Sequence, residues 1–413
     1  MPTSWEIERK KRYSKLESNN EADVVIIGCG LAGAWCAHFL SKAKKKVIVL
    51  ERGEIGEGQT HYTTAFITQS IDTPIVELEK IFDRDRAQLI WQSGGEAIKD
   101  IERVVKEEKI NCEFRYAPYF IFAKDEGEFE ELEKEHKKVT LLGFKTRLHK
   151  NISLGFKHEG ALEIVGEAKF HPIKFLYGLA LSAGRRGAEI YEKTEVVKIL
   201  GTGPYRVHTK SGLILRASNV IVATYDPFNN PKQTRFKKGM YTSYCMELEV
   251  PKKSVPEGMY IDLSNPYYYI RVDSVRGARQ SRMIVGGEDH RSELKVSSAR
   301  SHGSLLRFVK KTFPGLKFKV AKKWKGAIME SSDGVALIGE YAPGLYVATA
   351  FSGNGMTYSA IAGRLITDLI LGRDNPYIEI YDPKRKMEIK ALLYKARDYT
   401  GSFLGGAVRK FLK

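Results

Sequence analysis

The chain has 413 residues, of which 43% are hydrophobic and 28% charged, and its 67 Lys and Arg outnumber its 50 Asp and Glu to give a formal net charge of +17. This length predicts two domains, or one domain with large insertions, and the composition excludes disorder for most of the chain and a collagen-like architecture for all of it. The four cysteines form no Cys-x-x-Cys pair and no Cys/His cluster with metal spacing, so we expect no metal site and a reducing compartment.

The N-terminal end is charged throughout and predicts neither a signal peptide nor a membrane span, so the expected location is cytoplasmic. The positive charge is compatible with nucleic acid, an anionic membrane surface, an acidic protein or an anionic substrate, and equally with solvated surface lysines.

A polar N-terminal arm is predicted over residues 1–20, followed by a strand, a helix and a second strand. Residues 23–28 are a β-branched run that ends in glycine, which is typical of a buried parallel strand. Residues 31–42 are compatible with a helix, and residues 46–51 form a second apolar run. Together they predict a βαβ unit of the size of one mononucleotide-binding half.

The rest of the chain divides into helical and β-rich stretches. Before residue 225 the patterns predict helices at 84–108, 126–138 and 172–185, and strands at 112–123, 187–200, 205–222 and 217–224. From 236 to 325 the chain is β-rich, with its strongest strands at 259–262, 267–272 and 283–287 and a helix at 298–312. A strand at 345–350, a glycine loop and a helix at 356–371 follow. Nucleotide-type elements thus recur near the start, middle and end, and the pieces between them would form a second domain.

The segment Gly28-Cys-Gly-Leu-Ala-Gly33 fits the motif G-x-G-x-x-G between a buried strand and a helix. Its glycines permit a tight turn, a close approach of a pyrophosphate and packing of the helix on the strand. Glu51 ends the second strand, where a carboxylate can bind an adenosine ribose and disfavours a 2′-phosphate. The alternative is a glycine turn without a phosphate.

Two further segments are rich in glycine and hydroxyl residues. Residues 52–65 follow Glu51 directly and could wrap a pyrophosphate, or form an ordinary surface loop. Ser352-Gly-Asn-Gly-Met-Thr357 precedes the last long helix, whose N-terminus could stabilise negative charge on a flavin, or be a simple helix start.

These segments occur in the order found in the FAD-dependent oxidoreductases of the D-amino-acid oxidase superfamily, which the chain resembles over about residues 20–375. The superfamily includes glycine oxidase, sarcosine oxidase and dimethylglycine dehydrogenase. Besides the glycine motif and Glu51, the resemblance rests on Gly58-Gln-Thr60 with Thr63-Thr64, Thr194-Glu-Val196, Val220-Ile-Val-Ala-Thr224, Trp324-Lys-Gly-Ala327, Asp333-Gly-Val-Ala-Leu-Ile-Gly339 and Gly344–Met356.

Phe170-His-Pro172 and Gly286-Gly-Glu-Asp-His290 resemble a bacterial branch that often carries a C-terminal Rieske iron–sulfur domain. The chain stops about where that domain would start and lacks the cysteines for its cluster, so the resemblance implies a stand-alone version whose electrons go elsewhere. It also implies an α/β (α+β) fold with a Rossmann-type FAD/NAD(P)-binding domain and a β-rich mixed-sheet substrate domain, both discontinuous. The expected boundaries are 1–20 for the arm; 21–82, 165–232 and 325–375 for the FAD-binding domain; 83–164 and 233–324 for the substrate domain; and 376–413 for a basic tail.

The resemblance implies FAD as the cofactor and a position for each matching residue. Leu31, Ala32 and Gly33 would lie along the pyrophosphate and Glu51 would bind the adenosine ribose, with Gly28, Gly30 and Arg52 as further cofactor contacts. The remaining expected contacts are Thr60, Thr63 and Thr64 on the pyrophosphate or flavin side, Val196 at the adenine, Thr224 after the neighbouring strand, and Gly353, Asn354, Gly355, Met356 and Thr357 at the flavin pyrimidine edge.

The chain departs from the family pattern at three places. His61-Tyr62 replaces Gly-His, Tyr225 replaces a glycine after Val-Ala-Thr, and Ala350 replaces a glycine before the aromatic residue of the last loop. These departures concern contacts with the flavin ring. The strand position at which sarcosine-oxidase relatives carry a Lys matches Ile284, which favours a dehydrogenase over an oxidase.

The reaction implied by the resemblance is dehydrogenation of a C–N bond in an amine or amino acid, with hydride transfer to flavin N5 and hydrolysis of the imine; it requires no particular side-chain acid or base. Alternation places Tyr269 and Arg271 on one face of a strand, where Arg271 could bind a substrate carboxylate or simply face solvent. We expect Tyr269, Arg271 and Met356 near the substrate. The electron acceptor could be oxygen, a quinone or a redox protein.

For several residues the sequence allows two interpretations. His61 could tether the flavin or be a loop histidine, Cys29 could be redox-sensitive or a small buried side chain, and His290 could titrate in a site or orient a loop. Residues 384–413 could form a basic amphipathic tail on an anionic membrane near a quinone, or a helix docked on the protein. A flavoprotein acting on modified tRNA is an alternative function, but no RNA-binding motif is present and the basic residues are spread along the chain.

Overall fold

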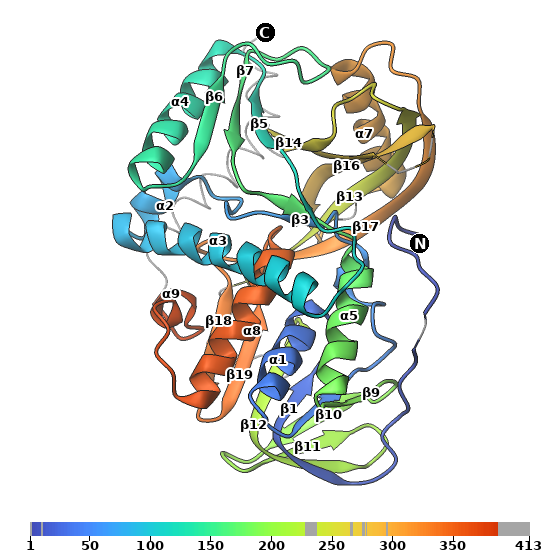
Figure 1. Ribbon diagram of the computed structural model, residues 1–413, viewed down its shortest axis with the longest axis vertical. Helices are drawn as coiled ribbons and strands as arrows, with labels where there is room; N and C mark the ends of the chain where they lie inside the picture. Colours follow the sequence, from blue (N-terminus) through green and yellow to red (C-terminus); the bar gives the residue numbers. More distant parts are fainter. Residues whose placement is uncertain are drawn as a thin grey trace.

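The computed structural model describes residues 2–9, 11–227, 238–264, 267–274, 277, 279–294 and 296–386. It has two large mixed β-sheets, one in each half of the molecule, with helices packed on both (Figure 1). The expected α/β fold, with a nucleotide-type domain and a β-rich domain that are both discontinuous in sequence, is confirmed.

The first sheet has a parallel centre. β1 (Asn20–Ile27) pairs in parallel with β2 (Val47–Leu50) and with β12 (Ile214–Tyr225); β2 pairs in parallel with β9 (Glu189–Tyr191), and β12 with β19 (Leu345–Thr349). Antiparallel strands complete it: β10 (Val196–Leu200) and β11 (Tyr205–Thr209) beside β12, and β18 (Leu337–Ala342) beside β19. All four residues of β2 are buried, as expected of a strand covered on both faces.

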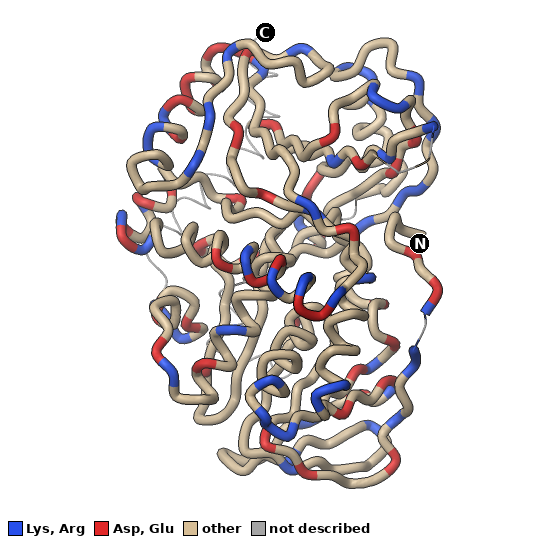
Figure 2. Tube along the Cα trace, in the orientation of Figure 1, with Lys and Arg blue, Asp and Glu red and all other residues tan. Residues whose placement is uncertain are grey.

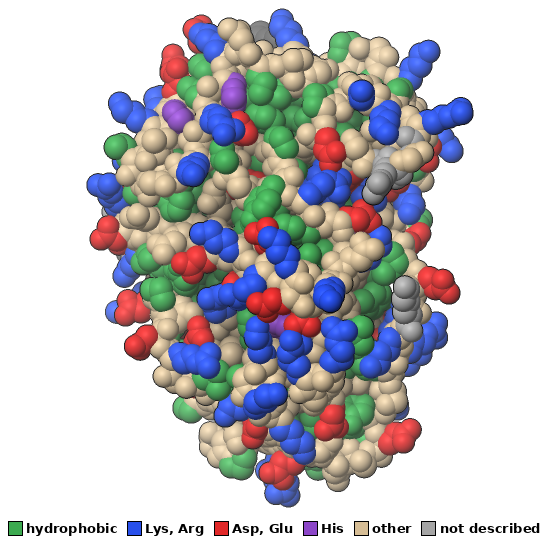
Figure 3. Space-filling view, viewed as in Figure 1, with side chains coloured by type: hydrophobic (Ala, Val, Ile, Leu, Met, Phe, Trp, Pro, Cys, Tyr) green, Lys and Arg blue, Asp and Glu red, His purple; other side chains and the backbone are tan. Residues whose placement is uncertain are grey.

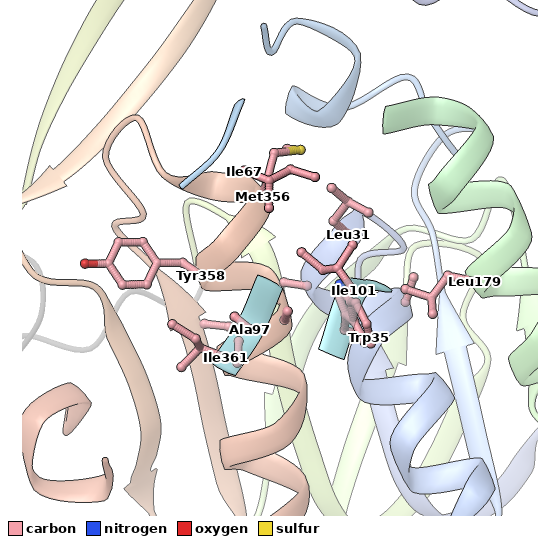
Figure 4. Packing of buried hydrophobic residues seen from close by; sticks show 14 of the residues in the cluster. Leu31, Trp35, Ile67, Ala97, Ile101, Leu179, Met356, Tyr358 and Ile361 are labelled. Atoms are coloured by element: carbon pink, nitrogen blue, oxygen red, sulfur yellow. The ribbon is translucent and has the colours of Figure 1, made fainter. Parts of the chain in front are cut away.

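Helix α1 (Leu31–Lys42) packs between α5 (Pro172–Arg185) and α8 (Gly355–Leu371). Figure 4 shows Leu31 and Trp35 of α1 between Leu179 of α5 and Ile361 of α8. The approach of α1 to α8 is close, because a Cβ built on Gly363 would lie 2.6 Å from the Cβ of Trp35. This packing fixes the N-termini of α1 and α8 relative to the first sheet.

The second sheet has the order β17-β13-β16-β15-β14-β5-β7-β6 and is antiparallel except for the pair β14 and β5. Its strands are β5 (Tyr119–Ala123), β6 (Thr146–His149), β7 (Gly160–Ile164), β13 (Lys238–Pro251), β14 (Gly258–Asp262), β15 (Tyr269–Ser274), β16 (Gln280–Arg291) and β17 (Lys319–Ser331). Helices α4 (Glu126–Leu141) and α7 (Ser298–Thr312) pack on this sheet. The remaining α-helices of the described residues are α2 (Ile75–Ile81), α3 (Arg84–Glu107) and α9 (Ile378–Tyr381), and a small sheet joins β3 (Phe66–Ile67), β4 (Arg115–Tyr116) and β8 (Ala168–Lys169).

Three elements differ from the sequence predictions. The strand expected over 112–123 is divided into β4 and β5, with Pro118 between them, because proline cannot donate to a strand ladder. The strand expected over 187–200 divides into β9 and β10 around Lys193, whose φ is +51°. Residues 325–331, which were expected in the FAD-binding domain, continue β17 of the second sheet instead of joining the first. The other domain boundaries remain predictions.

The N-terminal arm is docked on the protein. Trp5 is fully buried and its indole N–H donates to the carbonyl of Thr63. Arg9 bonds to the carboxylates of Glu54 and Glu192. The polar composition of the segment did not predict this docking, because the segment is anchored by a single aromatic side chain, Trp5.

Lys and Arg occur throughout both halves of the molecule and are interspersed with Asp and Glu (Figure 2). The face drawn in Figure 3 shows the same mixture of basic, acidic and apolar side chains. None of the helices in the described part of the chain is both long and apolar enough to cross a bilayer. The tail expected over residues 384–413 lies almost wholly outside the described residues.

Candidate functional site

A cavity of about 890 Å³ is lined by residues of both large sheets. From the first half of the molecule it takes the turn after β1, the ends of β2, β12 and β19, and the start of α8. From the second half it takes side chains of β5, β13, β14, β15 and β17. Its position at the carboxyl ends of the parallel strands is where open α/β sheets bind their ligands.

The glycine turn after β1 has no room for a side chain at two of its three glycines, Gly28 and Gly33. Gly28 has a φ of +98°, and a Cβ on it would lie 2.6 Å from the carbonyl oxygen of Ala223. A Cβ on Gly33 would lie 1.9 Å from the carbonyl oxygen of Gly28. The motif glycines are therefore required sterically at these two positions, by β12 on one side and by the turn itself on the other.

The N-terminus of α1 faces the cavity through Leu31 and Ala32. Its N-cap residue is Gly30, which has no side chain to cap the first turn. The N–H of Leu31 lies 3.4 Å from Oγ1 of Thr60, at the long end of hydrogen-bond range. A helix N-terminus of this kind carries partial positive charge and free donors, which suit a phosphate group.

Glu51 stands at the end of β2, beside the glycine turn. One carboxylate oxygen accepts a hydrogen bond of 2.8 Å from the N–H of Cys29, and the other accepts one of 2.9 Å from the N–H of Gly53. Arg52, Thr194, Glu195 and Val196 line the same end of the cavity. These bonds hold the carboxylate at the edge of the cavity.

The loop after β2 is fixed by the second sheet. The indole N–H of Trp324 donates to the carbonyl of Tyr62 over 3.0 Å, and the N–H of Ala327 donates to the Gln59 side chain over 3.2 Å. Thr60, Thr63 and Thr64 all line the cavity. The tryptophan of the sequence segment 324–327 thus positions a loop residue that lies 262 residues earlier in the chain.

The start of α8 is held by side chains of the segment before α2. The Asn354 amide donates to Oγ1 of Thr68 over 3.0 Å and to the carbonyl of Ser70 over 3.1 Å, while its own Oδ1 is buried without a partner among the described residues. The N–H of Gly353 donates to the Asp72 carboxylate over 2.9 Å. A second uncapped helix N-terminus therefore reaches the cavity.

Two of the three positions at which the chain lacks a family glycine keep a glycine-like backbone. Tyr225 has a φ of +67° and Ala350 a φ of +59°, both in the left-handed region. The hydroxyl of Thr349 donates to the carbonyl of Tyr225 over 2.5 Å, which ties the two strand ends together. A residue with a Cβ atom costs roughly 1–2 kcal/mol in the left-handed conformation, so the protein keeps this turn geometry at both positions in spite of the strain.

Of the expected site residues, most line the cavity: Gly28, Gly30, Leu31, Ala32, Glu51, Arg52, Thr60, Thr63, Thr64, Val196, Thr224, Gly353, Asn354, Gly355, Met356 and Tyr269. Gly33, Thr357 and Arg271 do not. Gly33 packs inside the turn, and the Thr357 hydroxyl donates to the carbonyl of Thr68 over 2.9 Å, which turns it away from the cavity.

The expectation that Arg271 binds a substrate carboxylate does not fit the structure. Its side chain is 2% exposed. Its guanidinium donates to the carbonyls of Thr64, Ala65 and Phe170 over 2.9–3.0 Å, and its Nε donates to Asp273 over 3.1 Å. Arg271 does share a face of β15 with Tyr269, as alternation predicted, but it lies where the two halves of the molecule meet.

Asp273 is the centre of this buried ion network. Burial alone would raise the pKa of Asp273, but Arg271, Lys169 and Arg282 hold the pKa well below its usual value. The ion pairs with Lys169 and Arg282 are 3.0 and 2.7 Å long. The network joins β15 to β16 and β8 and has a structural character, since none of these four residues lines the cavity.

The substrate-side wall includes residues that the sequence analysis missed. Ser243 and Cys245 of β13, Tyr267, and Asp72 all line the cavity with Tyr269. The alternation of Ser243 and Cys245 along one strand was a usable signal, whereas nothing local marked Asp72. The thiol of Cys29, within the turn, is fully buried and burial raises its pKa, which fits the interpretation of a small buried side chain.

His61 lies in the short helical turn Gln59–His61, outside the residues that line the cavity, and burial lowers its pKa. His290 is the second-last residue of β16, and its Nε2 lies 3.2 Å from the hydroxyl of Tyr244. Both placements favour the structural interpretation of each histidine over a role in the site.

The residues present fit a dinucleotide. Four features border one continuous cavity. They are the glycine turn 28–33, here called the glycine cradle, which has no room for a Cβ at Gly28 or Gly33; the N-terminus of α1; the Glu51 carboxylate; and Oδ1 of Asn354, which is buried without a partner among the described residues. A phosphate group and a ribose hydroxyl find complementary partners at one end, and a planar ring system can lie between the two sheets at the other.

The model of one family, described as FAD dependent oxidoreductase (DAO), matches residues 23–369. A Bacillus subtilis protein whose name assigns it to the Rieske 2Fe-2S iron–sulfur proteins is 28% identical over 378 residues, which cover 90% of this chain and 73% of that protein. The γ-glutamylputrescine oxidoreductase of Escherichia coli K12 is 26% identical over 385 residues and covers 87% of each chain. The crystal structure of glycine oxidase from Geobacillus kaustophilus superposes with a TM-score of 0.75 at 20% identity, covering 89% of this chain and 99% of the other.

Proposed function

This chain belongs to the DAO family of FAD-dependent oxidoreductases, and we propose that it dehydrogenates a C–N bond of an amine or amino acid. The observation that carries the proposal is the continuity of the cavity, which joins the glycine cradle to a chamber walled by Tyr267, Tyr269 and Cys245. The similarity to γ-glutamylputrescine oxidoreductase, an enzyme named for an amine derivative, supports the substrate class.

FAD, the cofactor of the family, supplies a hydride acceptor at the flavin N5 atom when it is bound. On this proposal the N-terminus of α1 and Thr60 bind the pyrophosphate, Glu51 binds the adenosine ribose and Val196 holds the adenine. The N-terminus of α8, with Asn354 and Met356, faces the pyrimidine edge, where its partial positive charge stabilises negative charge.

The chain's own residues would orient the substrate and exclude water. Tyr269 packs edge-on against Phe66, with ring centroids 6.1 Å apart, and lies 6.0 Å from the ring of Tyr267. These rings form an apolar wall against which an α-carbon can be held in one orientation, and such positioning supplies a large part of the rate enhancement in hydride transfer.

The proposal is tested by the visible spectrum of the purified, FAD-loaded protein during anaerobic addition of an amine and amino-acid panel. We expect one class of compounds to bleach the flavin absorbance within seconds to minutes. Readmitted air distinguishes the acceptors: rapid recolouring indicates an oxidase, and slow recolouring indicates a dehydrogenase that uses a quinone or a redox protein. Bleaching by hydroxy acids or reduced nicotinamides, but by no amine, would contradict the proposal.

A further inference from the structure

The pairing of β13 with β16 is interrupted next to the cavity. The register is regular from Pro251↔Gln280 to Tyr244↔Gly287, and the next pair is Thr242↔His290. Ser243 therefore lies opposite two residues, Glu288 and Asp289, which is a β-bulge. Glu288 has a φ of +60°, in the left-handed region that a non-glycine residue adopts only when its surroundings impose it.

The bulge turns its two acidic residues to opposite faces of the sheet. The carboxylate of Glu288 accepts a hydrogen bond of 2.5 Å from the hydroxyl of Tyr268, whose ring stacks on Phe308 of α7. The carboxyl of Asp289 instead accepts a hydrogen bond from Ser243, on the face that borders the cavity. Strict alternation would have given the reverse arrangement, so the bulge is what brings Asp289 to the cavity side.

Asp289 is the inner end of a chain of hydroxyl groups. Oγ of Ser243 lies 2.9 Å from the hydroxyl of Tyr269, which is also 3.4 Å from the Cys245 thiol. Tyr269, Ser243 and Cys245 line the cavity, while Asp289 lies behind them. Oδ1 of Asp289 is buried and has no partner among the described residues.

The groups that face Asp289 make it a proton acceptor suited to neutral pH. They are Ser243 and the carboxyl groups of Asp72 and Glu330, with the hydroxyls of Tyr267 and Tyr269 nearby; Glu288, on the opposite face of the sheet, adds a weaker electrostatic contribution. Burial raises the pKa of Asp289 to about 7, the neighbouring carboxylates act in the same direction, and the hydrogen bond from Ser243 opposes the rise. A base with its pKa near the working pH is the most effective kind.

We propose that Asp289 receives, through the hydroxyls of Ser243 and Tyr269, the proton that a substrate ammonium group must lose before its α-carbon can release hydride. The inference rests on the proposed function. Asp289 acts on the substrate only through the two hydroxyl groups, so it is a positioning residue for the proton, while Tyr269 is the group in contact with the substrate.

The transfer balances without any further reactant. The substrate N–H proton moves to the Tyr269 oxygen as the Tyr269 proton moves to Ser243 and the Ser243 proton moves to Asp289. Both hydroxyls end as they began, Asp289 is neutral, and the substrate nitrogen has a lone pair. That lone pair forms the C=N bond as the C–H electron pair leaves with the hydride. After hydrolysis of the imine, the proton returns along the same hydroxyls to the departing ammonia or amine.

The test compares the pH dependence of anaerobic flavin reduction in the wild-type enzyme and in Asp289→Asn, which keeps the shape and removes the charge. We expect the rate constant of flavin reduction by bound substrate to be constant in the wild-type enzyme above about pH 7 and to fall below it. In Asp289→Asn the substrate must arrive as the neutral amine, which for an amine pKa of about 10 is roughly 1% of the total at about pH 8. The ratio of reduction rate to dissociation constant therefore falls ~100-fold at that pH and recovers tenfold per pH unit as the pH rises.

Glu288→Gln is the matched control, because it changes the neighbouring acid of the same bulge on the opposite face of the sheet. Because Glu288 is the weakest of the three carboxylates that raise the pKa of Asp289, Glu288→Gln is expected to keep the wild-type profile apart from a small displacement of its acid limb to lower pH. Bound FAD absorbance and melting temperature establish that both variants are folded. Tyr269→Phe, which removes the outer hydroxyl, is expected to shift the profile as Asp289→Asn does.

A second readout needs no turnover. An amine without an α-hydrogen binds but cannot be oxidised, and calorimetry in two buffers of different ionisation enthalpy counts the protons released on its binding. Near pH 8 the wild-type protein is expected to release almost none, because Asp289 retains the proton, and Asp289→Asn about one.

An unchanged pH profile in Asp289→Asn, or the same altered profile in Glu288→Gln, would overturn the proton role while leaving amine oxidation intact. A wild-type enzyme that no amine reduces would instead remove the proposed function itself, and the inference with it.

Discussion

Replacement of Arg271 by Met tests whether this residue is structural or binds substrate. Methionine keeps the length and apolar stem of the side chain and removes every donor. Three buried carbonyl oxygens, those of Thr64, Ala65 and Phe170, lose a charged donor at 2.9–3.0 Å, and Asp273 loses one of its cationic partners. A buried ion pair broken on one side costs about 3–5 kcal/mol, and we expect Arg271→Met to lower the free energy of unfolding by that amount.

The assay measures two quantities on the FAD-loaded protein. The melting temperature, followed by loss of flavin and by circular dichroism, is expected to fall by several degrees. The ratio of the dissociation constant for an amino acid to that for the amine without its carboxylate is expected to stay as in the wild-type protein. Arg279→Met is the control, because Arg279 is exposed on the same hairpin and its removal should change stability by less than about 0.5 kcal/mol.

The reasoning would be refuted by the opposite pair of results. If Arg271→Met melted like the wild-type protein but bound amino acids ten- to a hundredfold more weakly and amines unchanged, the guanidinium would be a carboxylate-binding group, as the sequence alone suggested. A bidentate pair of that kind is worth about 1.5–3 kcal/mol, which corresponds to that range.

Three further predictions concern the cradle, the arm and a buried acid. Gly33→Ala, whose Cβ would lie 1.9 Å from a carbonyl oxygen, should abolish retention of FAD through purification, whereas Gly184→Ala, with nothing within 4 Å, should retain FAD and melt slightly higher; equal FAD content in both would contradict the cradle. Trp5→Ala should lower the free energy of unfolding by about 3–5 kcal/mol and expose residues 2–9 to limited proteolysis, and an arm as resistant as in the wild-type protein would argue against the anchor. Burial holds the pKa of Glu167 well above its usual value, so the folded protein keeps a proton that the unfolded chain loses above about pH 4.3. The contribution of Glu167 to the free energy of unfolding is therefore greatest at low pH and declines as the pH rises. Glu167→Gln should therefore gain melting temperature relative to the wild-type protein between about pH 5 and about pH 8, and a constant difference over that range would refute the raised pKa.

The fold could be predicted from the sequence because its signals are local. The run 23–51 contains a strand, a glycine turn, a helix and a second strand within thirty residues, and the structure forms β1, α1 and β2 there. The FAD cofactor and the oxidoreductase class followed from the order of short motifs and are confirmed by the family match. The individual cofactor contacts stay predictions, although most of the residues named for them line one cavity.

The substrate side was less predictable because long-range contacts determine it. Alternation gave the face of Arg271 correctly, but it could not show that carbonyl groups 101 to 207 residues away would occupy the guanidinium. Asp289 was obscured for the opposite reason: a bulge inverts the alternation on which the face of a strand residue is judged. The buried anchor Trp5 lay in a segment whose overall polarity indicated only a loose arm.

Strand β15 connects these observations. Tyr269 at its start lines the substrate wall, and Arg271, two residues further on the same face, binds the carbonyls of Thr64 and Ala65 at the end of the cofactor loop. Because a strand rises about 3.3 Å per residue, two side chains on one face are separated by a fixed distance of roughly 7 Å. The ion network around Arg271 therefore sets the distance between the Tyr269 hydroxyl and the loop that carries Thr63 and Thr64. Loosening that network should increase the dissociation constants of cofactor and substrate together, even though Arg271 lies outside the cavity.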